Sequence, residues 1–120
     1  MMYADMKSML MMADEPAIRL EMVIDFGKNL SPVPDGAICT EILGCASFVQ
    51  ICRLGNHFYG VADSAIVRGI VAILIAMVDG RGADEIKKMD LAGEFASLNL
   101  NLGAGRLNGV NSMIRFFQNL

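Results

Sequence analysis

The sequence predicts an α+β fold, a small antiparallel three-stranded sheet packed against several helices, and three observations support this. Apolar and β-branched residues gather in three short runs, at 37–43, 48–54 and 57–61. Gly55 and Asn56 separate the last two runs, and both residue types tolerate the positive φ of a two-residue hairpin turn. Helical periodicity on both sides of the clustered strands disfavours a doubly wound parallel sheet.

The first three helices follow from their start and stop signals. Residues 1–12 are rich in methionine and predict a short helix or a frayed start. Two acidic residues before Pro16 open the second helix, since proline is well placed in a first turn. Asp63 or Ser64 can cap a long apolar helix that reaches about Val78, because a side-chain oxygen there accepts from free N–H groups.

The last third of the chain predicts shorter elements and a closing helix. Residues 83–89 and 90–98 each predict a short helix, and residues 99–105 predict a loop. An amphipathic helix then begins at Arg106 or Leu107. Its inward-facing residues are expected to be Leu107, Val110, Ile114 and Phe117. Residues 1–120 show no repeat or linker and are expected to form one domain, with 1–13 as a short or frayed N-terminal helix.

Composition and charge exclude several classes of function. The net charge is −3 and the ten basic residues form no cluster, so no nucleic acid or anionic membrane is an expected partner. The longest apolar run, 69–78, is too short to span a bilayer. No basic region followed by a long apolar stretch marks a signal peptide. Three cysteines without a regular framework favour a reducing, cytoplasmic compartment.

Cys45 is the main candidate for chemistry because it follows Gly44 between two predicted strands. A glycine at this turn can adopt φ > 0 and leaves room above the sulfur, and a thiol on a loop can be reached by another molecule. The residues alone leave two interpretations open, a reactive thiol and a structural cysteine that packs at a bend. A thiol hydrolase would also require His57, the single histidine, to be oriented at Cys45.

Other patterns carry weaker signals. Cys39 and Cys52 lie inside predicted strands and lack the spacing of a CxxC pair, so core packing is favoured over a metal site. His57, beside a hairpin turn, is expected to be exposed. The glycines of 103–109 do not have the spacing of a phosphate-binding loop, which leaves a flexible loop and a helix start.

Three segments taken together resemble the SufE family of sulfur-acceptor proteins, which serve cysteine desulfurases in iron–sulfur cluster assembly. Residues 43–49 match that family's G-C-x-S-x-V stretch, and residues 62–70 are similar to its acidic, serine- and alanine-rich entry to a long apolar helix. Residues 106–109, followed by Met113, resemble its closing S-R-x-N-G-L-x-x-M motif. Gln50 stands where the family usually has a tryptophan.

The resemblance implies that Cys45 accepts persulfide sulfur from a PLP-dependent cysteine desulfurase, stimulates that enzyme and relays the sulfur to an iron–sulfur scaffold. It implies no cofactor and no metal bound by this chain. Arg106 is then either a charge that stabilises the sulfur anion or an ordinary surface residue. Asp63 is either a contact of the cysteine loop or of the partner or, as favoured here, a helix cap. The competing interpretation is a non-catalytic interaction module whose Cys45 is structural.

Overall fold

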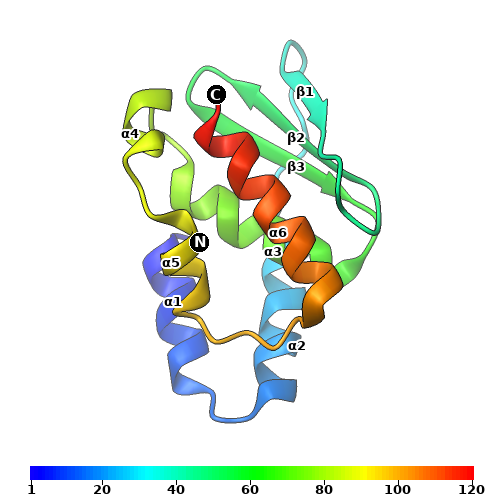
Figure 1. The fold of residues 1–120 in the computed structure, drawn as a ribbon, viewed down its shortest axis with the longest axis vertical. Helices are drawn as coiled ribbons and strands as arrows, with labels where there is room; N and C mark the ends of the chain where they lie inside the picture. Colours follow the sequence, from blue (N-terminus) through cyan, green and yellow to red (C-terminus); the bar gives the residue numbers. More distant parts are fainter.

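The computed structural model describes residues 1–120 and contains six helices and one small sheet, which lies at one side of the molecule (Figure 1). The predicted α+β class is confirmed. Along the chain the elements are α1 (Tyr3–Met12), α2 (Pro16–Gly27), β1 (Ile38–Glu41), β2 (Val49–Leu54), β3 (His57–Ala62), α3 (Ala65–Val78), α4 (Ala83–Lys87), α5 (Leu91–Ala96) and α6 (Gly103–Gln118).

The sheet has the order β1-β2-β3 and both of its strand pairs are antiparallel. Leu54 pairs with His57 across the Gly55-Asn56 turn, as the turn chemistry predicts. β1 pairs only with β2 and is therefore an edge strand, and all four of its residues are exposed. This places the connection between β1 and β2 at the end of the sheet opposite the hairpin turn.

The core lies between the sheet and the helices, with α3 at its centre. Nine of the fourteen residues of α3 are buried, which explains its nearly continuous apolar sequence. Gly69 lets α2 and α3 approach closely, because a Cβ at Gly69 would collide with the backbone carbonyl of Val23. On the sheet, Phe58 meets Phe117 of α6 edge to face, with ring centroids 5.4 Å apart.

Two helix starts differ from their predictions. Ser64 caps α3 by accepting a hydrogen bond from Val67 N, so the preferred assignment of Asp63 as the cap is wrong. α6 begins at Gly103 and includes residues predicted as a loop, despite the low helix propensity of glycine. Leu107 is 43% exposed and does not face inward. Residues 103–108 are all exposed, so the first turns of α6 extend beyond the core.

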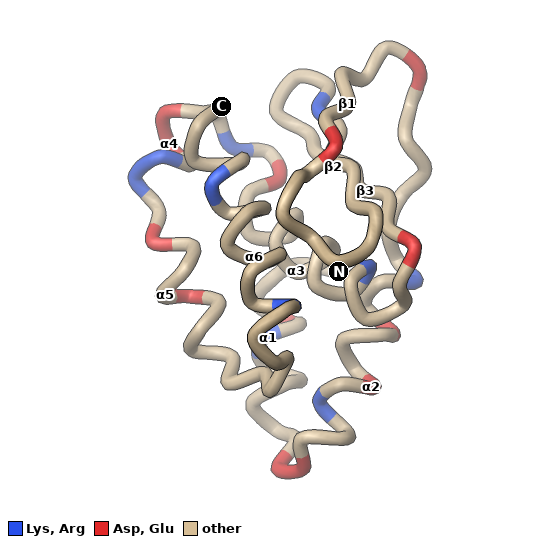
Figure 2. Tube along the Cα trace, turned by 45° about the vertical axis from the view of Figure 1, so that its right-hand side comes forward, with Lys and Arg blue, Asp and Glu red and all other residues tan.

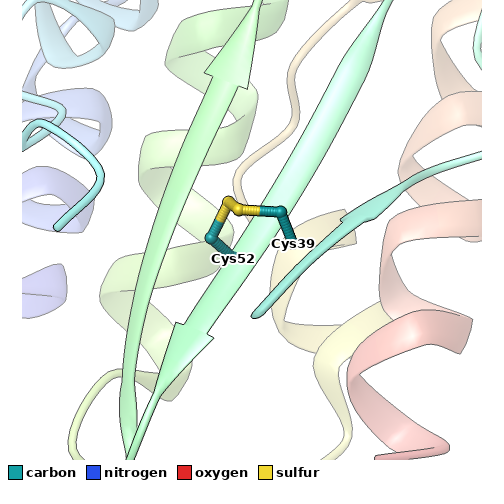
Figure 3. The surroundings of a disulfide bond; sticks show 2 residues. All are labelled: Cys39 and Cys52. Carbon is teal, nitrogen blue, oxygen red and sulfur yellow. A yellow bond between two sulfur atoms is a disulfide. The ribbon is translucent and has the colours of Figure 1, made fainter. Parts of the chain in front are cut away.

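The cysteines of the sheet correct a further expectation. Cys39 of β1 and Cys52 of β2 form a disulfide across the two strands (Figure 3). The two residues are direct partners in the β1–β2 register, which brings their side chains to the same face. Cys52 is fully buried as predicted, but Cys39 is exposed and neither is a free thiol. The prediction of a reducing compartment rested on unpaired cysteines, and two of the three cysteines are paired.

Charged residues are spread over the whole molecule (Figure 2). Lys and Arg positions lie in several separate elements and alternate with Asp and Glu along the trace. One ion pair, Lys7 with Glu94 at 3.0 Å, joins α1 to α5. None of the helices combines the length and apolar character needed to cross a bilayer.

Candidate functional site around Cys45

Cys45 lies in the connection between β1 and β2, at residues 42–48. The base of this connection is closed by a hydrogen bond of 2.8 Å from Ile42 N to Val49 O. Beyond that bond the chain leaves the sheet, and Gly44 adopts φ +91°, a conformation that L side chains rarely take. Leu43 is 78% exposed, whereas Cys45 is half-buried. The loop therefore holds its thiol at the boundary between core and solvent.

Helix α6 provides the surface against which this loop rests. The Cys45 thiol donates to Gly109 O across 3.8 Å, and a Cβ at Gly109 would lie 3.3 Å from Cys45 Sγ. A Cβ at Gly44 would lie 2.5 Å from Ser112 Oγ. Ser112 is fixed in turn, since its hydroxyl donates to Asn108 O at 3.1 Å and accepts from Arg115 at 3.2 Å. Two glycines thus permit the close contact between loop and helix.

A pocket of about 220 Å³ opens beside the thiol. Three elements contribute to it: the cysteine loop, the start of α3 and the start of α6. Arg106 is exposed and lies on the rim of this pocket, and its side chain makes no hydrogen bond or ion pair within the chain. The lining residues are Cys45, Ala46, Ser47, Ser64, Val67, Ile70, Gly105, Arg106, Gly109 and Met113.

Burial determines the resting protonation of the site. It raises the pKa of the Cys45 thiol above its ordinary value, because the thiolate is less well solvated than the neutral thiol. No charged partner offsets this effect in the isolated chain. At neutral pH the resting group is therefore a thiol, and its activation requires better solvation or a nearby cation.

Two other residues singled out from the sequence differ in their relation to the cysteine loop. Asp63 is exposed and its carboxylate makes no hydrogen bond, but its backbone N donates to Phe48 O, at the end of the loop, at 3.4 Å. Its side chain borders a different pocket, shared with Gly27, Lys28 and residues 30–33. His57 is exposed as predicted, at the hairpin end of β3, where Nδ1 lies 3.4 Å from the carboxylate of Asp79. Five residue steps along β3 correspond to about 16 Å. A hydrolase that pairs His57 with Cys45 is inconsistent with this arrangement.

The approach of other site members to the loop had no recognisable local signal. Val67 and Ile70 belong to the 62–70 segment and Ser112 lies within α6, and all three reach the loop only through the fold. Gly109 belongs to the 106–109 motif, but its contact with Cys45 joins positions 64 residues apart. No group of three or more His, Cys, Asp or Glu side chains is arranged to hold a metal ion.

The fold and this site define a small α+β protein with one free thiol on a loop between two strands. Residues 4–120 match the family model described as "SufE: Fe-S metabolism associated domain", and the chain belongs to the SufE family. This result confirms the resemblance inferred from the sequence motifs.

Three similar proteins illustrate this relationship. An uncharacterized SufE-like protein of Rhizobium meliloti (strain 1021) is 37% identical over 114 residues, which cover 85% of this chain and 81% of that protein. The sulfur acceptor protein CsdE of Escherichia coli (strain K12) is 33% identical over 104 residues, covering 79% and 71%. The solution structure of a hypothetical protein from Thermus thermophilus has a TM-score of 0.66 at 14% identity, covering 98% and 90%, and supports the fold alone.

Proposed function

We propose that this chain is a sulfur acceptor that receives persulfide sulfur on Cys45 from a PLP-dependent cysteine desulfurase. The observation that carries the proposal is the placement of Cys45. It is the free cysteine of the chain, it lies on a loop outside the strand ladder, and it borders a pocket. Membership of the SufE family and similarity to a protein named as a sulfur acceptor support the same role.

The reaction needs a reachable thiolate and no bound cofactor. The Cys45 thiolate attacks the outer sulfur of the donor's cysteine persulfide, so a new S–S bond forms at Cys45 while the donor's S–S bond breaks. The sulfur of the donor's own cysteine leaves as a thiolate and takes up the proton that Cys45 released. The transfer therefore has no net change in oxidation state. A downstream thiol on an iron–sulfur scaffold takes the sulfur by the same exchange.

The surroundings of Cys45 suit a persulfide that has to survive between two encounters. A persulfide is readily oxidised, and the contact with α6 limits its exposure. The pocket of about 220 Å³ has room for one additional sulfur atom. Arg106 on its rim supplies a positive charge without an internal partner, which favours the persulfide anion. Asp63, exposed before α3, is assigned to partner contact.

The same burial requires a movement when the donor docks. A half-buried thiol with a raised pKa is a poor nucleophile, so we expect the 42–48 loop to leave α6 in the complex. Leu43 and Phe48, which are exposed, can then contact the desulfurase. Separation of the loop from α6 on docking gives a route by which this chain stimulates the desulfurase. Hydrogen exchange of residues 42–48 should increase on donor binding, and an unchanged loop would contradict this step.

Intact mass spectrometry tests the acceptor role directly. The chain is incubated with a cysteine desulfurase and free cysteine, then weighed before and after reduction. We expect a reductant-sensitive gain of one or more sulfur atoms, absent in Cys45→Ser and retained in Cys39→Ala/Cys52→Ala. A set of active desulfurases that adds no sulfur would reject the proposal and favour the interaction module, which also predicts that Cys45→Ser keeps partner function.

A further inference from the structure

The Cys39–Cys52 disulfide encloses the loop that carries Cys45. Its two half-cystines are 13 positions apart, and Cys45 lies near the middle of the closed segment. Glu41 at the end of β1 is four residues before Cys45. Whatever holds β1 to the sheet therefore also limits how far this loop can move.

Apart from the disulfide, little attaches β1 to the molecule. β1 has four residues, all of them exposed, and it pairs with β2 alone. No side chain within β1 is buried, so backbone pairing and the S–S bond hold the strand itself, and the next anchor is Ile42, which is buried and donates to Val49 O at 2.8 Å. A short edge strand with this little burial opens locally at low cost once a covalent link is removed.

One of the two half-cystines of the disulfide is exposed to solvent. The bond joins the edge strand β1 to β2 (Figure 3). Cys52 is fully buried, whereas Cys39 is exposed. A dithiol can attack at Cys39 and then close on itself. This gives two protein thiols and one reductant disulfide, so the dithiol is oxidised as the protein is reduced.

We infer that the Cys39–Cys52 pair is a redox-responsive clasp on the Cys45 site. In the oxidised chain the clasp keeps β1 on the sheet and the loop on α6, and Cys45 reacts slowly. Reduction by a dithiol loosens β1 and leaves the Ile42–Val49 hydrogen bond as the remaining tie at the base of the loop, so that the tip can leave α6 more often and expose Cys45. The clasp depends on the proposed acceptor role for its purpose, because it regulates the site that would receive sulfur.

Alkylation of Cys45 by iodoacetamide tests the clasp without any sulfur donor. The oxidised chain and the chain pre-reduced with dithiothreitol are labelled under identical conditions, and the rate at Cys45 is followed by peptide mass. We expect a rate roughly tenfold higher after reduction, which corresponds to about 1.4 kcal/mol in the population of the open loop. Hydrogen exchange at residues 38–48 should rise in parallel.

The control is Cys39→Ala/Cys52→Ala, which lacks the clasp. Its Cys45 should be labelled at the fast rate with or without dithiothreitol. Equal labelling rates in the oxidised and reduced wild-type chain would overturn the inference. It would also be overturned if the mass of the chain under oxidising conditions showed that Cys39 and Cys52 both keep their thiol hydrogens, so that no disulfide forms. Failure of sulfur transfer with an intact rate difference would reject the acceptor role and leave the clasp standing. The wild-type comparison needs no variant to fold.

Discussion

The two ends of the β2 strand are held in different ways. At the hairpin end, direct hydrogen bonds fix the turn: Phe58 N donates to Asp79 Oδ1 at 2.9 Å and Gly80 N donates to Asn56 O at 2.7 Å. At the other end, the Cys45 loop rests on α6 through close packing of Gly44 and Cys45.

This difference separates a structural turn from a loop that can serve chemistry. Opening the hairpin would break backbone hydrogen bonds, each of which costs free energy when a partner is left unsatisfied. The Cys45 loop has backbone hydrogen bonds only at its two ends, Ile42 N to Val49 O and Asp63 N to Phe48 O, so lifting its tip from α6 mainly separates packed surfaces and one weak thiol contact. The residue proposed to meet other proteins is therefore on the end that can move at low cost.

The largest loss of stability is expected from removal of the disulfide, which joins β1 to β2 and plays no part in the hairpin turn. Cys39→Ala/Cys52→Ala should lower the free energy of unfolding by about 3 kcal/mol, because the unfolded chain loses a covalent loop closure. Urea denaturation without reductant measures this loss. Faster hydrogen exchange should be confined to β1 and residues 42–48. An unchanged urea midpoint would mean that the disulfide contributes nothing to stability.

Two glycines with positive φ provide a matched pair at the two ends. Gly44→Ala should cost about 2–3 kcal/mol, because the added Cβ meets Ser112 Oγ in addition to the backbone penalty. Gly55→Ala should cost about 1 kcal/mol, since nothing lies within 4 Å of its Cβ. Urea denaturation of both variants gives the comparison. Equal losses would show that α6 does not confine the Cys45 loop.

A third substitution weakens the hairpin end alone. Asp79→Ala removes the acceptor of Phe58 N and should lower the free energy of unfolding by about 1–2 kcal/mol. Asp79→Asn keeps an acceptor oxygen and should lose less. Cys45 alkylation should be the same in both variants and the wild type. A change in that rate would indicate that the two ends of the sheet are coupled.

The smallest effect concerns pH and the Cys45 thiol. Burial raises its pKa, so the alkylation rate of the folded chain should reach its midpoint at a higher pH than that of the urea-unfolded chain. The folded chain holds the Cys45 proton more tightly than the unfolded chain. The protonated thiol therefore contributes fully to the free energy of unfolding at any pH below the pKa of Cys45 in the unfolded chain. That contribution is lost as pH rises through the folded pKa. Coincident midpoints would contradict the half-buried placement.

The sequence was informative where structure depends on local chemistry. Gly55-Asn56 specified the hairpin, Pro16 marked the start of α2, and the motif around Cys45 identified the candidate site. The disulfide was missed because it depends on the β1–β2 register, which the long connection between these strands leaves open. Ser112 was missed because its contact with Gly44 exists only after α6 packs on the loop.

The disulfide between β1 and β2 also makes residues 39–52 a covalent ring within the chain. A protease that cuts once at the exposed loop, beside Leu43 for example, would open the ring without releasing a fragment. The nicked and intact chains would differ in mass by one water molecule. They would separate on a gel only after reduction.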